Sequence, residues 1–454
     1  MGNLFGTDGI RGIANVDLTC DLATKVGRAM AYVLLKSENE NPTVIIGKDT
    51  RLSSDMLECA LAAGLCSVGV NVISLGVVPT PAVAFLVRKY NANAGIMISA
   101  SHNPYQFNGI KIFQGDGYKL SDSLELEIEK IIENFDALNF SNQNIGTVEK
   151  KDDAIYDYID YIKGTINNNL SGLKVAFDCS NGSASRSCYE IFSSLGVRCF
   201  MLNDKPNGKN INENCGSVHV KGLIDFVKEN RMDAGIAFDG DADRCLAVDN
   251  KGNLFDGDFI MAICARNLKS KNKLKRDTVV GTVMTNMGFI KFCRENNLNF
   301  VASDVGDRYV LEKMRESNYN FGGEQSGHVI FLDYSTTGDG QLTAVQLLNI
   351  LKETGGKLSD FNLLISKYPQ IIINVEVSNE GKRSFANNEI VKDCIDKANE
   401  KLSIKDTDGM PIGRILVRPS GTEPLIRVML EGNDEKFIKT IGNEVAECIR
   451  ENIN

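Results

Sequence analysis

The sequence predicts a multi-domain α/β protein that ends in a smaller α+β unit. Strand-like runs alternate with helical patterns along most of the 454 residues, beginning with the β-rich run Thr43–Gly47. Repeated strand-then-helix units typically build parallel sheets with helices on both faces. A chain of this length is too long for one hydrophobic core and predicts about three domains.

The individual elements follow from local composition. After Thr43–Gly47, Ser53 and Ser54 are suitable N-cap residues, and apolar residues then recur at helical spacing. Further strands are expected at Val70–Leu75, Ala94–Ala100, Leu173–Asp178, Ala234–Phe238 and Val279–Met284. Small polar residues follow these runs, at the carboxyl ends of strands where parallel sheets bind ligands.

The last part of the chain has a different pattern. Strand-like runs precede an amphipathic helical pattern, which together predict a small α+β domain: Ile371–Val377, Arg414–Arg418, Leu425–Leu430 and the helix Asp434–Asn452. Polar or proline-containing stretches mark candidate domain boundaries at Asn139–Asp153, Asn250–Asp258 and Ser366–Gln370.

Composition argues against several functional classes. The net charge is −9 and no basic block is present, which disfavours nucleic acid as the main partner. The 12 cysteines are scattered without a Cys-x-x-Cys pair, as expected for reduced, mostly buried thiols in a cytoplasmic protein. No signal peptide is predicted, and glycines and prolines interrupt the uncharged stretch Cys59–Val87, so no membrane span is expected.

The strongest functional signal is Asp239-Gly-Asp-Ala-Asp-Arg244, which directly follows the apolar run Ala234–Phe238. In a straight strand this spacing places Asp239, Asp241 and Asp243 on one face. Such close like charges favour a hard cation. The segment therefore predicts one Mg²⁺ that is coordinated by the aspartates and also by a phosphate. The loop lacks the Gly and Glu of an EF-hand calcium site, and a solvated acidic turn is the remaining alternative.

A second signal, Ser99-Ala-Ser-His-Asn-Pro104, closes the predicted strand Ala94–Ala100. Ser101 is expected at the carboxyl end of that strand, with Lys111 shortly after it. A serine beside a cation and a Mg²⁺ site can accept or donate a phosphoryl group. A Ser-His pair by itself is more often a capped turn, and neither Ser101 nor Ser326 has the Gly-x-Ser-x-Gly pattern of an esterase.

Two further loops complete a set suited to a phosphosugar. The glycine-rich loop Gly322–His328 contains Glu324 and Ser326, which can hydrogen-bond sugar hydroxyls. The loop Arg418–Thr422, with Arg427, is suited to cradle a phosphate, because arginine binds phosphate oxygens bidentately. The nucleotide P-loop and the dinucleotide-binding glycine motif are both absent. Together the loops indicate phosphoryl transfer on a phosphosugar.

These motifs resemble those of the α-D-phosphohexomutases over nearly the whole chain. One signature falls in each of the four domains expected in that family: Ser99–Pro104, Asp239–Arg244, Gly323–His328 and Arg418–Thr422. Within the family, the chain is most similar to bacterial members that act on glucosamine phosphates, through Phe5–Gly12, Val305–Tyr309 and Gln325. Phe107 stands where the family usually has an acidic residue.

The resemblance implies three related α/β domains with mixed, mostly parallel sheets and a smaller C-terminal α+β domain, around a central cleft. The expected domains are residues 1–153 with the phosphoserine loop, 154–256 with the metal loop, 257–367 with the sugar loop, and 368–454 with the phosphate-binding loop.

The resemblance also implies roles for individual residues. Ser101 would carry a phosphate and, with Asp239, Asp241 and Asp243, bind one Mg²⁺ per chain. Arg11 and Lys111 would lie near the phosphoserine, and His102 and His328 would be proton carriers or hydrogen-bonding scaffolds. The substrate would contact Arg244, Glu324 and Ser326 through its sugar, and Arg418, Ser420, Gly421, Thr422 and Arg427 through its phosphate.

The implied reaction interconverts glucosamine 6-phosphate and glucosamine 1-phosphate through a bisphosphate, and it feeds amino-sugar nucleotide (UDP-GlcNAc) and cell-wall synthesis. The expected state is a cytoplasmic monomer or homodimer. Phosphomannomutase or phosphoglucomutase activity with the same machinery is the nearest alternative. A phosphatase of the haloacid dehalogenase type would leave Ser101 without a role, and a phosphosugar sensor would leave Ser101 unphosphorylated.

Overall fold

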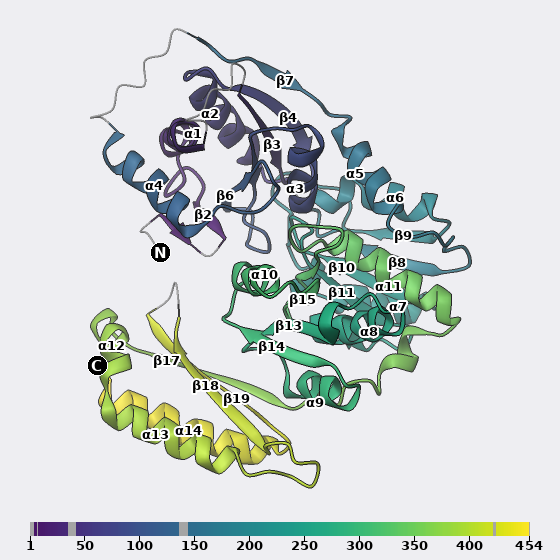
Figure 1. Cartoon of the computed structure of the whole chain (residues 1–454), viewed down its shortest axis with the longest axis vertical. Coiled ribbons are helices and arrows are strands. Elements are labelled where there is room, and N and C mark those ends of the chain that lie inside the picture. Colours follow the sequence, from purple (N-terminus) through teal and green to yellow (C-terminus); the bar gives the residue numbers. More distant parts are fainter. Residues whose placement is uncertain (1–3, 7, 35–41, 136–143, 421–423, 454) are drawn as a thin grey trace. The chain divides into compact units, whose positions relative to one another are not determined.

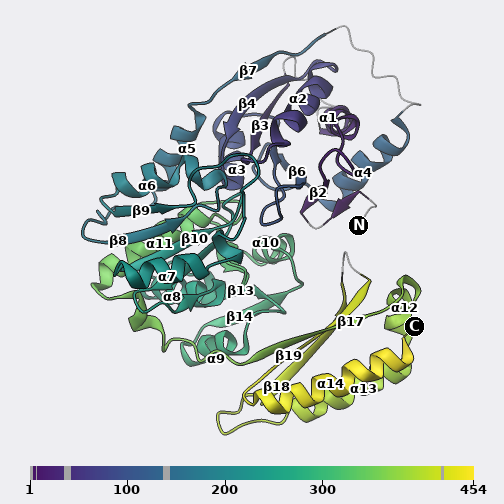
Figure 2. The ribbon, with the colours of Figure 1, turned by 180° about the vertical axis from the view of Figure 1, so that it is seen from behind.

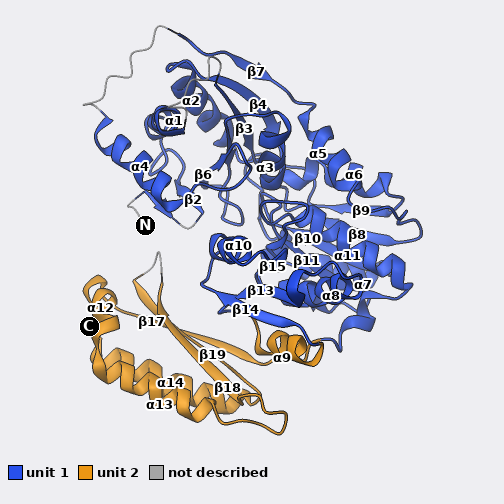
Figure 3. Ribbon diagram, in the orientation of Figure 1, with its two compact units in different colours: residues 1–284, 297–364 blue, residues 285–296, 365–454 orange. Residues whose placement is uncertain are grey.

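The computed structural model of the chain describes residues 4–6, 8–34, 42–135, 144–420 and 424–453. The chain divides into two compact units, coloured separately in Figure 3. Unit 1 comprises residues 1–284 and 297–364, and unit 2 comprises residues 285–296 and 365–454. The described part of unit 1 contains three sheets and that of unit 2 one sheet (Figure 1).

The first sheet has seven strands, all from the N-terminal part of the chain. Its order is β1 (Phe5–Gly6), β2 (Gly9–Ile13), β6 (Phe107–Gln114), β5 (Ala94–Ile98), β3 (Thr43–Lys48), β4 (Asn71–Val77) and β7 (Val148–Lys150). Strands β5, β3, β4 and β7 run parallel, whereas β1, β2 and β6 are joined by antiparallel pairings.

Helices cover both faces of this sheet. One face buries its apolar residues, Ile46 and Ile96 among them, against α1 (Cys20–Leu34), α2 (Ser54–Cys66) and α4 (Asp122–Glu133). On the opposite face Val83 of α3 (Thr80–Lys89) packs directly over Gly47 and Gly95. The alternation of large and absent side chains along β3 and β5 therefore sets how closely each helix approaches.

The second sheet has the order β12 (Leu254–Phe255), β11 (Cys245–Asp249), β10 (Ala234–Phe238), β8 (Lys174–Asp178) and β9 (Arg198–Leu202). Helix α7 (Lys221–Glu229) covers one face. On the other face α6 (Cys188–Ser194) stacks Phe192 on Phe177, with ring centroids 4.3 Å apart. Helices α5 (Ala154–Lys163) and α11 (Gly340–Thr354) pack together beside this sheet, although α11 comes from a much later part of the chain.

The third sheet has the order β14 (Asn299–Ser303), β13 (Thr278–Thr282), β15 (Phe321–Gly323) and β16 (Val329–Phe331). Helix α10 (Asp307–Glu316) packs on Val280 and Ile330, and α8 (Gly257–Ser270) contacts β15. Single-turn helices lie at Ser183–Arg186, Gly216–Val218, Lys275–Asp277, Leu358–Phe361 and Phe385–Asn387.

Unit 2 contains an antiparallel sheet in the order β17 (Gln370–Glu376), β19 (Leu425–Gly432) and β18 (Gly413–Pro419). Helices α13 (Glu389–Leu402) and α14 (Glu435–Asn452) lie side by side on one face of this sheet in both views (Figures 1 and 2). The unit also includes α12 (Asn379–Ser384) and α9 (Met287–Glu295), and Lys291 of α9 pairs with Asp408 at 2.5 Å.

The predicted α/β class with mixed sheets is confirmed, and a small α+β unit ends the chain. Most predicted strand boundaries move by one or two residues; for example, β4 covers Asn71–Val77, β5 ends at Ile98 and β13 covers Thr278–Thr282. Antiparallel strands contribute more than the strand-then-helix pattern indicates, since β6 and β11 return directly beside β5 and β10. Ser53 precedes α2 as predicted but makes no side-chain cap hydrogen bond.

All 12 cysteines lie within the described residues and none forms a disulfide there, and six of them are buried: Cys179, Cys188, Cys215, Cys245, Cys264 and Cys293. Within the described ranges, every helix is too short or too polar to cross a bilayer.

The buried N-cap of α11 predicts a pH-dependent contribution to stability. Both carboxylate oxygens of Asp339 accept hydrogen bonds from the Tyr158 hydroxyl, at 2.9 and 3.0 Å, and Oδ1 also accepts from the Leu342 amide at 2.9 Å. Burial nevertheless raises the pKa of Asp339 to about 7. Since an unfolded aspartate titrates near pH 3.9, the folded state binds the proton more tightly, and stability falls as pH rises from about 4 through 7.

Asp339→Asn should therefore reduce the loss of melting temperature between pH 5 and pH 7.5, measured by thermal unfolding followed by circular dichroism. Asp225→Asn, which alters a half-exposed carboxylate on α7, should leave the wild-type pH profile unchanged. Equal pH slopes for wild type and Asp339→Asn would contradict the prediction.

Candidate functional site

Three of the predicted loops meet in unit 1, each beginning where a strand ends. Residues 99–104 follow β5, residues 239–244 follow β10, and residues 323–328 connect β15 to β16. The Cys245 amide donates to the Gly327 carbonyl at 3.0 Å, which joins the second loop to the third. Gly240 packs so closely on the Ser101 carbonyl that a Cβ atom there would lie 2.5 Å from it. A glycine is therefore required where the first two loops meet.

Ser101 is buried and faces the aspartate loop. Its Oγ donates to Asp239 Oδ2 at 2.5 Å and lies 3.4 Å from Nδ1 of His102. Its backbone is left-handed, with φ of 50°, which is uncommon for a serine. Strand β5 ends at Ile98, so the turn at residues 99–101 aims the hydroxyl across the edge of the sheet.

The three aspartates form the predicted cluster. Asp239, Asp241 and Asp243 are buried, and one carboxylate oxygen from each lies within 4.8 Å of those of the other two. Burial rules out a solvated acidic turn. The Oδ1 atoms of Asp241 and Asp243 are buried without a hydrogen-bond partner. Orphaned anionic oxygens in this arrangement fit a hard divalent cation.

The backbone of this cluster differs from the prediction. The sequence pattern predicts a straight strand with alternating side chains, but β10 ends at Phe238 and the loop then turns through Ala242, whose φ is 57°. The carboxylates converge because the loop curls around them. Because Ala242 has a Cβ atom, this left-handed turn carries a steric cost that the contacts of the loop must offset.

Lys111 neutralises much of the cluster from the neighbouring strand β6. Its buried Nζ lies 2.8 Å from Asp241, 2.9 Å from Asp8 and 3.5 Å from Asp243. Burial alone lowers the pKa of a lysine, but the three carboxylates outweigh it and hold the pKa of Lys111 well above its usual value. Thr80 also donates to Asp241, at 2.6 Å.

The aspartates are not electrostatically equivalent. Burial and the negative charges of Asp243 and Asp241 raise the pKa of Asp239 well above its usual value. Burial also acts on Asp243, but Lys111, His328 and Arg244 together lower its pKa. A cation bound between these carboxylates would lower the pKa of Asp239, which would then present an ionised oxygen to Ser101.

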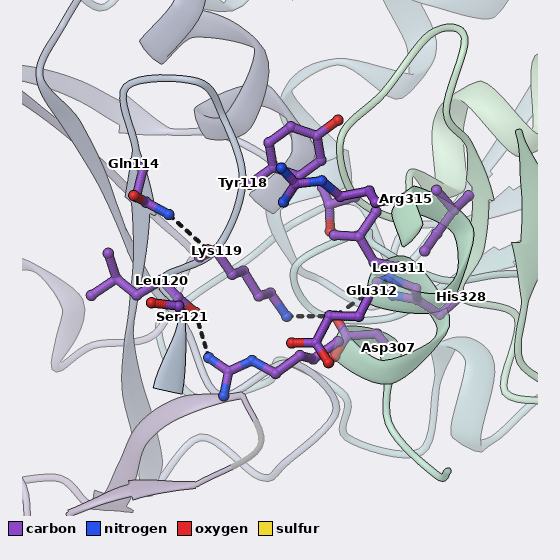
Figure 4. A pocket seen from close by; sticks show the side chains of 13 residues that line it. Gln114, Tyr118, Lys119, Leu120, Ser121, Asp307, Leu311, Glu312, Arg315 and His328 are labelled. Atoms are coloured by element: carbon purple, nitrogen blue, oxygen red, sulfur yellow. Dashed lines mark hydrogen bonds and ion pairs between the residues drawn. The ribbon is translucent and has the colours of Figure 1, made fainter. Parts of the chain in front are cut away.

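A ring of alternately acidic and basic groups extends from this cluster to the third loop. Arg11, which lies on β2 opposite Gly109, is outside this ring but forms an ion pair with one of its members, Asp8. The ring runs Lys111–Asp8 (2.9 Å), Asp8–Lys119 (2.5 Å), Lys119–Asp307 (2.5 Å), Asp307–His328 (3.6 Å), His328–Asp243 (3.6 Å) and Asp243–Lys111 (3.5 Å). Figure 4 shows Lys119 reaching Asp307 across a cavity of about 90 Å³, which His328 also lines.

His328 is held on both ring nitrogens. Nδ1 faces Asp243, and the Gly338 amide donates to Nε2 at 3.0 Å, so the hydrogen of the neutral ring lies on Nδ1. Burial lowers the pKa of His328, but Asp243 and Asp307 raise it above the usual value overall. Gly338 packs flat on the ring, and a Cβ atom there would lie 2.4 Å from it.

Gly338→Ala should therefore displace His328 and destabilise the fold by about 1–3 kcal/mol, the usual cost of overpacking a buried site. The melting temperature and a crystal structure of the variant measure both effects. Gly222→Ala is the matched control, because a Cβ atom on Gly222 has open space around it. An unmoved ring in Gly338→Ala would contradict this prediction.

The remaining predicted residues of unit 1 lie around the same loops. Burial and the charges of Arg244 and Arg11 lower the pKa of His102 to about 4, so its ring is neutral near pH 7. The Arg244 amide donates to Asp239 at 3.2 Å. Glu324 accepts from the Gly306 amide at 3.2 Å, and burial raises its pKa. The Oγ of Ser326 is buried without a hydrogen-bond partner.

The fourth predicted loop lies in unit 2. Arg418 on β18 stands directly opposite Arg427 on β19, and burial together with Arg427 lowers the pKa of Arg418. The Ser420 amide donates to the Leu425 carbonyl at 2.9 Å. Gly421 and Thr422 lie outside the described residues. Two guanidinium groups placed directly opposite each other are unfavourable unless an anion lies between them.

Several residues of the site were not found from the sequence. They are Asp8, Asp49, Arg51, Thr80, Lys119, Asn212, Asp307 and Gly338. Asp49 and Arg51 directly follow β3. Because ligands bind at the carboxyl ends of parallel strands, their position in the sequence could have identified them. Asn212 lies in a loop without any comparable pattern.

Comparison with known families accounts for almost the whole chain. The family Phosphoglucomutase/phosphomannomutase matches through its alpha/beta/alpha domain I at residues 2–139, domain II at 156–252, domain III at 256–368 and C-terminal domain at 372–448. The chain belongs to this family, that of the α-D-phosphohexomutases.

Full-length relatives are also found. Proteins named phosphoglucosamine mutase from Clostridium novyi and Clostridium acetobutylicum are each 50% identical over 456 residues, covering 100% of both chains. Among solved structures, a phosphoglucomutase/phosphomannomutase family protein from Burkholderia thailandensis matches with a TM-score of 0.81 at 24% identity, covering 98% of this chain and 97% of that one. An N-acetylphosphoglucosamine mutase from Aspergillus fumigatus matches with a TM-score of 0.68 at 17% identity, covering 99% and 96%. These likenesses describe the shared fold.

Proposed function

We propose that this enzyme interconverts glucosamine 6-phosphate and glucosamine 1-phosphate. The observation that carries the proposal is the buried Ser101 hydroxyl, 2.5 Å from Asp239 in the aspartate cluster, in a chain 50% identical over its full length to proteins named phosphoglucosamine mutase. The product would enter amino-sugar nucleotide (UDP-GlcNAc) and cell-wall precursor synthesis. Phosphoglucomutase or phosphomannomutase activity is the nearest alternative.

The proposal includes one Mg²⁺ held by Asp239, Asp241, Asp243 and a phosphate on Ser101. The orphaned oxygens of Asp241 and Asp243 support this ligand set. A bound Mg²⁺ would supply charge neutralisation for the transferred phosphoryl group. Lys111 and Arg11 would add fixed positive charge around the same group, since both are anchored to Asp8.

The reaction needs two balanced transfers. In the first, the bond from phosphorus to Ser101 Oγ breaks, a bond forms to the free sugar hydroxyl, and the hydroxyl proton leaves to a base. The resulting bisphosphate turns over in the site. Its other phosphoryl group then forms a bond to Ser101 Oγ while its bond to the sugar oxygen breaks, and that sugar oxygen takes up the proton. The neutral His102, whose Nδ1 lies 3.4 Å from Ser101 Oγ, is the candidate proton acceptor, and His328, engaged at both ring nitrogens, would serve as a hydrogen-bonding scaffold.

The proposal assigns substrate recognition to two sets of residues. Glu324, Ser326 and Arg244 would read the sugar, and the buried, orphaned Oγ of Ser326 supports a polar ligand at that loop. Arg418, Ser420, Gly421, Thr422 and Arg427 would hold the distal phosphate. The opposed pair Arg418 and Arg427 supports an anion there.

We further propose four domains at residues 1–153, 154–256, 257–367 and 368–454, a cytoplasmic location, and a monomeric or homodimeric state.

Removal of one arginine of the opposed pair should weaken substrate binding without lowering the stability of the fold. Arg427→Gln should raise the KM for the phosphosugar about tenfold or more, because a charge-assisted hydrogen bond is lost. It should not lower the melting temperature, because a like-charge repulsion is also relieved. Arg450→Gln, at a half-exposed position on α14, is the control and should change neither quantity. An unchanged KM in Arg427→Gln would argue against the phosphate cradle.

The function is tested by ³¹P NMR of the purified protein with Mg²⁺ and a trace of sugar bisphosphate. Glucosamine 6-phosphate and glucose 6-phosphate are run side by side. A 1-phosphate signal that grows much faster from the amino sugar supports the proposal, and faster conversion of glucose 6-phosphate indicates the neighbouring activity. Free inorganic phosphate indicates a phosphatase, and no change in either sample indicates a sensor.

A further inference from the structure

We propose that Asp49 and Arg51 form a buried positioning pair that holds Ser101 in the backbone conformation that turns its hydroxyl toward the aspartate cluster. The inference rests on the proposed phosphoryl-carrying role of Ser101. It concerns two side chains that come from the end of β3 and do not themselves reach the reacting oxygen.

The need for such a pair arises from the backbone of Ser101. Its φ of 50° lies in the left-handed region, which an L-residue with a Cβ atom rarely adopts. A serine loop without outside support would relax toward a commoner backbone conformation. Any such relaxation would rotate Oγ away from Asp239, to which it is now 2.5 Å distant.

The pair holds both ends of the Ser101 residue. On the amide side, the Ser101 N–H donates to Ser99 Oγ at 3.0 Å, and Ser99 Oγ donates to Asp49 Oδ2 at 2.6 Å. On the carbonyl side, Arg51 Nη2 donates to the Ser101 oxygen at 2.9 Å. Asp49 and Arg51 are themselves joined at 2.8 Å, so one ion pair fixes the direction of the Ser101 peptide groups on each side.

The chemistry of the pair matches positioning better than stabilisation. Both side chains have an exposed fraction of 0%. A buried ion pair often adds little net stability compared with apolar side chains, which leaves geometry as its contribution. Arg51 uses three nitrogens on three acceptors, because Nε binds Asp49, Nη2 binds Ser101 and Nη1 binds the Pro104 carbonyl at 2.6 Å. A lysine has one nitrogen and does not reproduce this planar fork.

A second donor supports the same carbonyl from the other side. Asn212, in the loop between β9 and α7, donates to the Ser101 oxygen at 2.9 Å and to the Asn103 oxygen at 3.0 Å. Ser101 is thus held jointly by the loop that follows β3 of the first sheet and by the loop that follows β9 of the second sheet. Loss of Asn212 should have the same effect as loss of Arg51, but a smaller one.

The test compares Arg51→Lys and Asn212→Ala with Asn320→Ala, which removes an equally buried asparagine that bonds Lys273 and Asp333 away from the site. For each full-length variant, kcat and KM are measured with glucosamine 6-phosphate and Mg²⁺. Intact-mass spectrometry follows the transfer of a phosphoryl group from the sugar bisphosphate to Ser101, and the rates are normalised to folded protein by circular dichroism.

Arg51→Lys should lower kcat and the rate of Ser101 phosphorylation about 100-fold, because a misplaced nucleophile costs about that much. The KM should change by less than about threefold, since the sugar and phosphate contacts are retained. Asn212→Ala should lower both rates about tenfold, because Ser101 itself loses only one of its two carbonyl hydrogen bonds. Asn320→Ala should match the wild type in both.

A kcat for Arg51→Lys within about threefold of wild type would overturn the inference. So would equal losses in Asn212→Ala and Asn320→Ala, which would indicate a general structural role. If Arg51→Lys does not fold, the comparison of Asn212→Ala with Asn320→Ala decides. If the wild type phosphorylates Ser101 but converts no sugar phosphate, the proposed function fails, and the phosphorylation rates of the variants still test the pair.

Discussion

Ser101→Ala should abolish turnover almost completely while leaving the fold intact. The Ser101 hydroxyl is buried and donates to Asp239 of the aspartate cluster at 2.5 Å. Loss of a nucleophile that forms a covalent intermediate lowers kcat by about a thousandfold or more. The rate of ³¹P conversion measures this loss, and intact mass should show no phosphoryl group taken up from the bisphosphate.

Ser187→Ala is the matched control for this experiment. Ser187 is also fully buried and donates one hydrogen bond, to Gln341 at 2.8 Å, but lies away from the cluster. Its variant should keep normal turnover. Near-normal activity in Ser101→Ala, or a phosphoryl group still bound to that variant, would rule out the assignment of Ser101.

The second large effect is expected from Asp241→Ala. Asp241 contributes an orphaned oxygen to the cluster and also anchors Lys111 and Thr80. Its removal should lower turnover by about a hundredfold or more and abolish the dependence on Mg²⁺, since loss of a ligand from a catalytic metal site removes the charge it supplies. Binding of Mn²⁺, followed by electron paramagnetic resonance, measures the site independently of activity.

Asp178→Asn is the control for the metal experiment. Asp178 ends β8, in the same sheet as β10, and is buried, but its oxygens accept the Ser180 and Gly216 amides at 3.0 and 2.9 Å. Its variant should bind Mn²⁺ as the wild type does. Turnover by Asp241→Ala that still rises with added Mg²⁺ would contradict the metal site.

The sequence predicted best what depends on neighbouring residues. The strands at Ala234–Phe238 and Thr43–Lys48 are short apolar runs that end in polar residues, so their type and position follow from local pattern. The aspartate cluster was predicted for the same reason. The path of its backbone was predicted wrongly, because the turn at Ala242 depends on contacts with other loops, such as the Thr80 amide on the Asp241 carbonyl at 2.9 Å.

The rest of the site depends on residues distant in the sequence. The chain from Asp8 through Lys119 to Asp307 joins three segments, none of which has a motif of its own for charge pairing. The antiparallel return of β6 beside β5 was missed because a strand in the interior of a sheet has the same buried pattern whether its neighbours run parallel or antiparallel to it. Such partners are set by the packing of the whole unit.

The position of α11 limits how the gene can be divided. This helix follows β16 of the third sheet, yet its N-cap Asp339 bonds Tyr158 of α5, and its Gln341 bonds Ser187 beside the second sheet. A fragment of the chain that stops before Gly340 would lack the helix that covers α5. The second and third sheets are therefore poor candidates for separate expression or for exchange between relatives by recombination, and truncation libraries should recover them only as one inherited block.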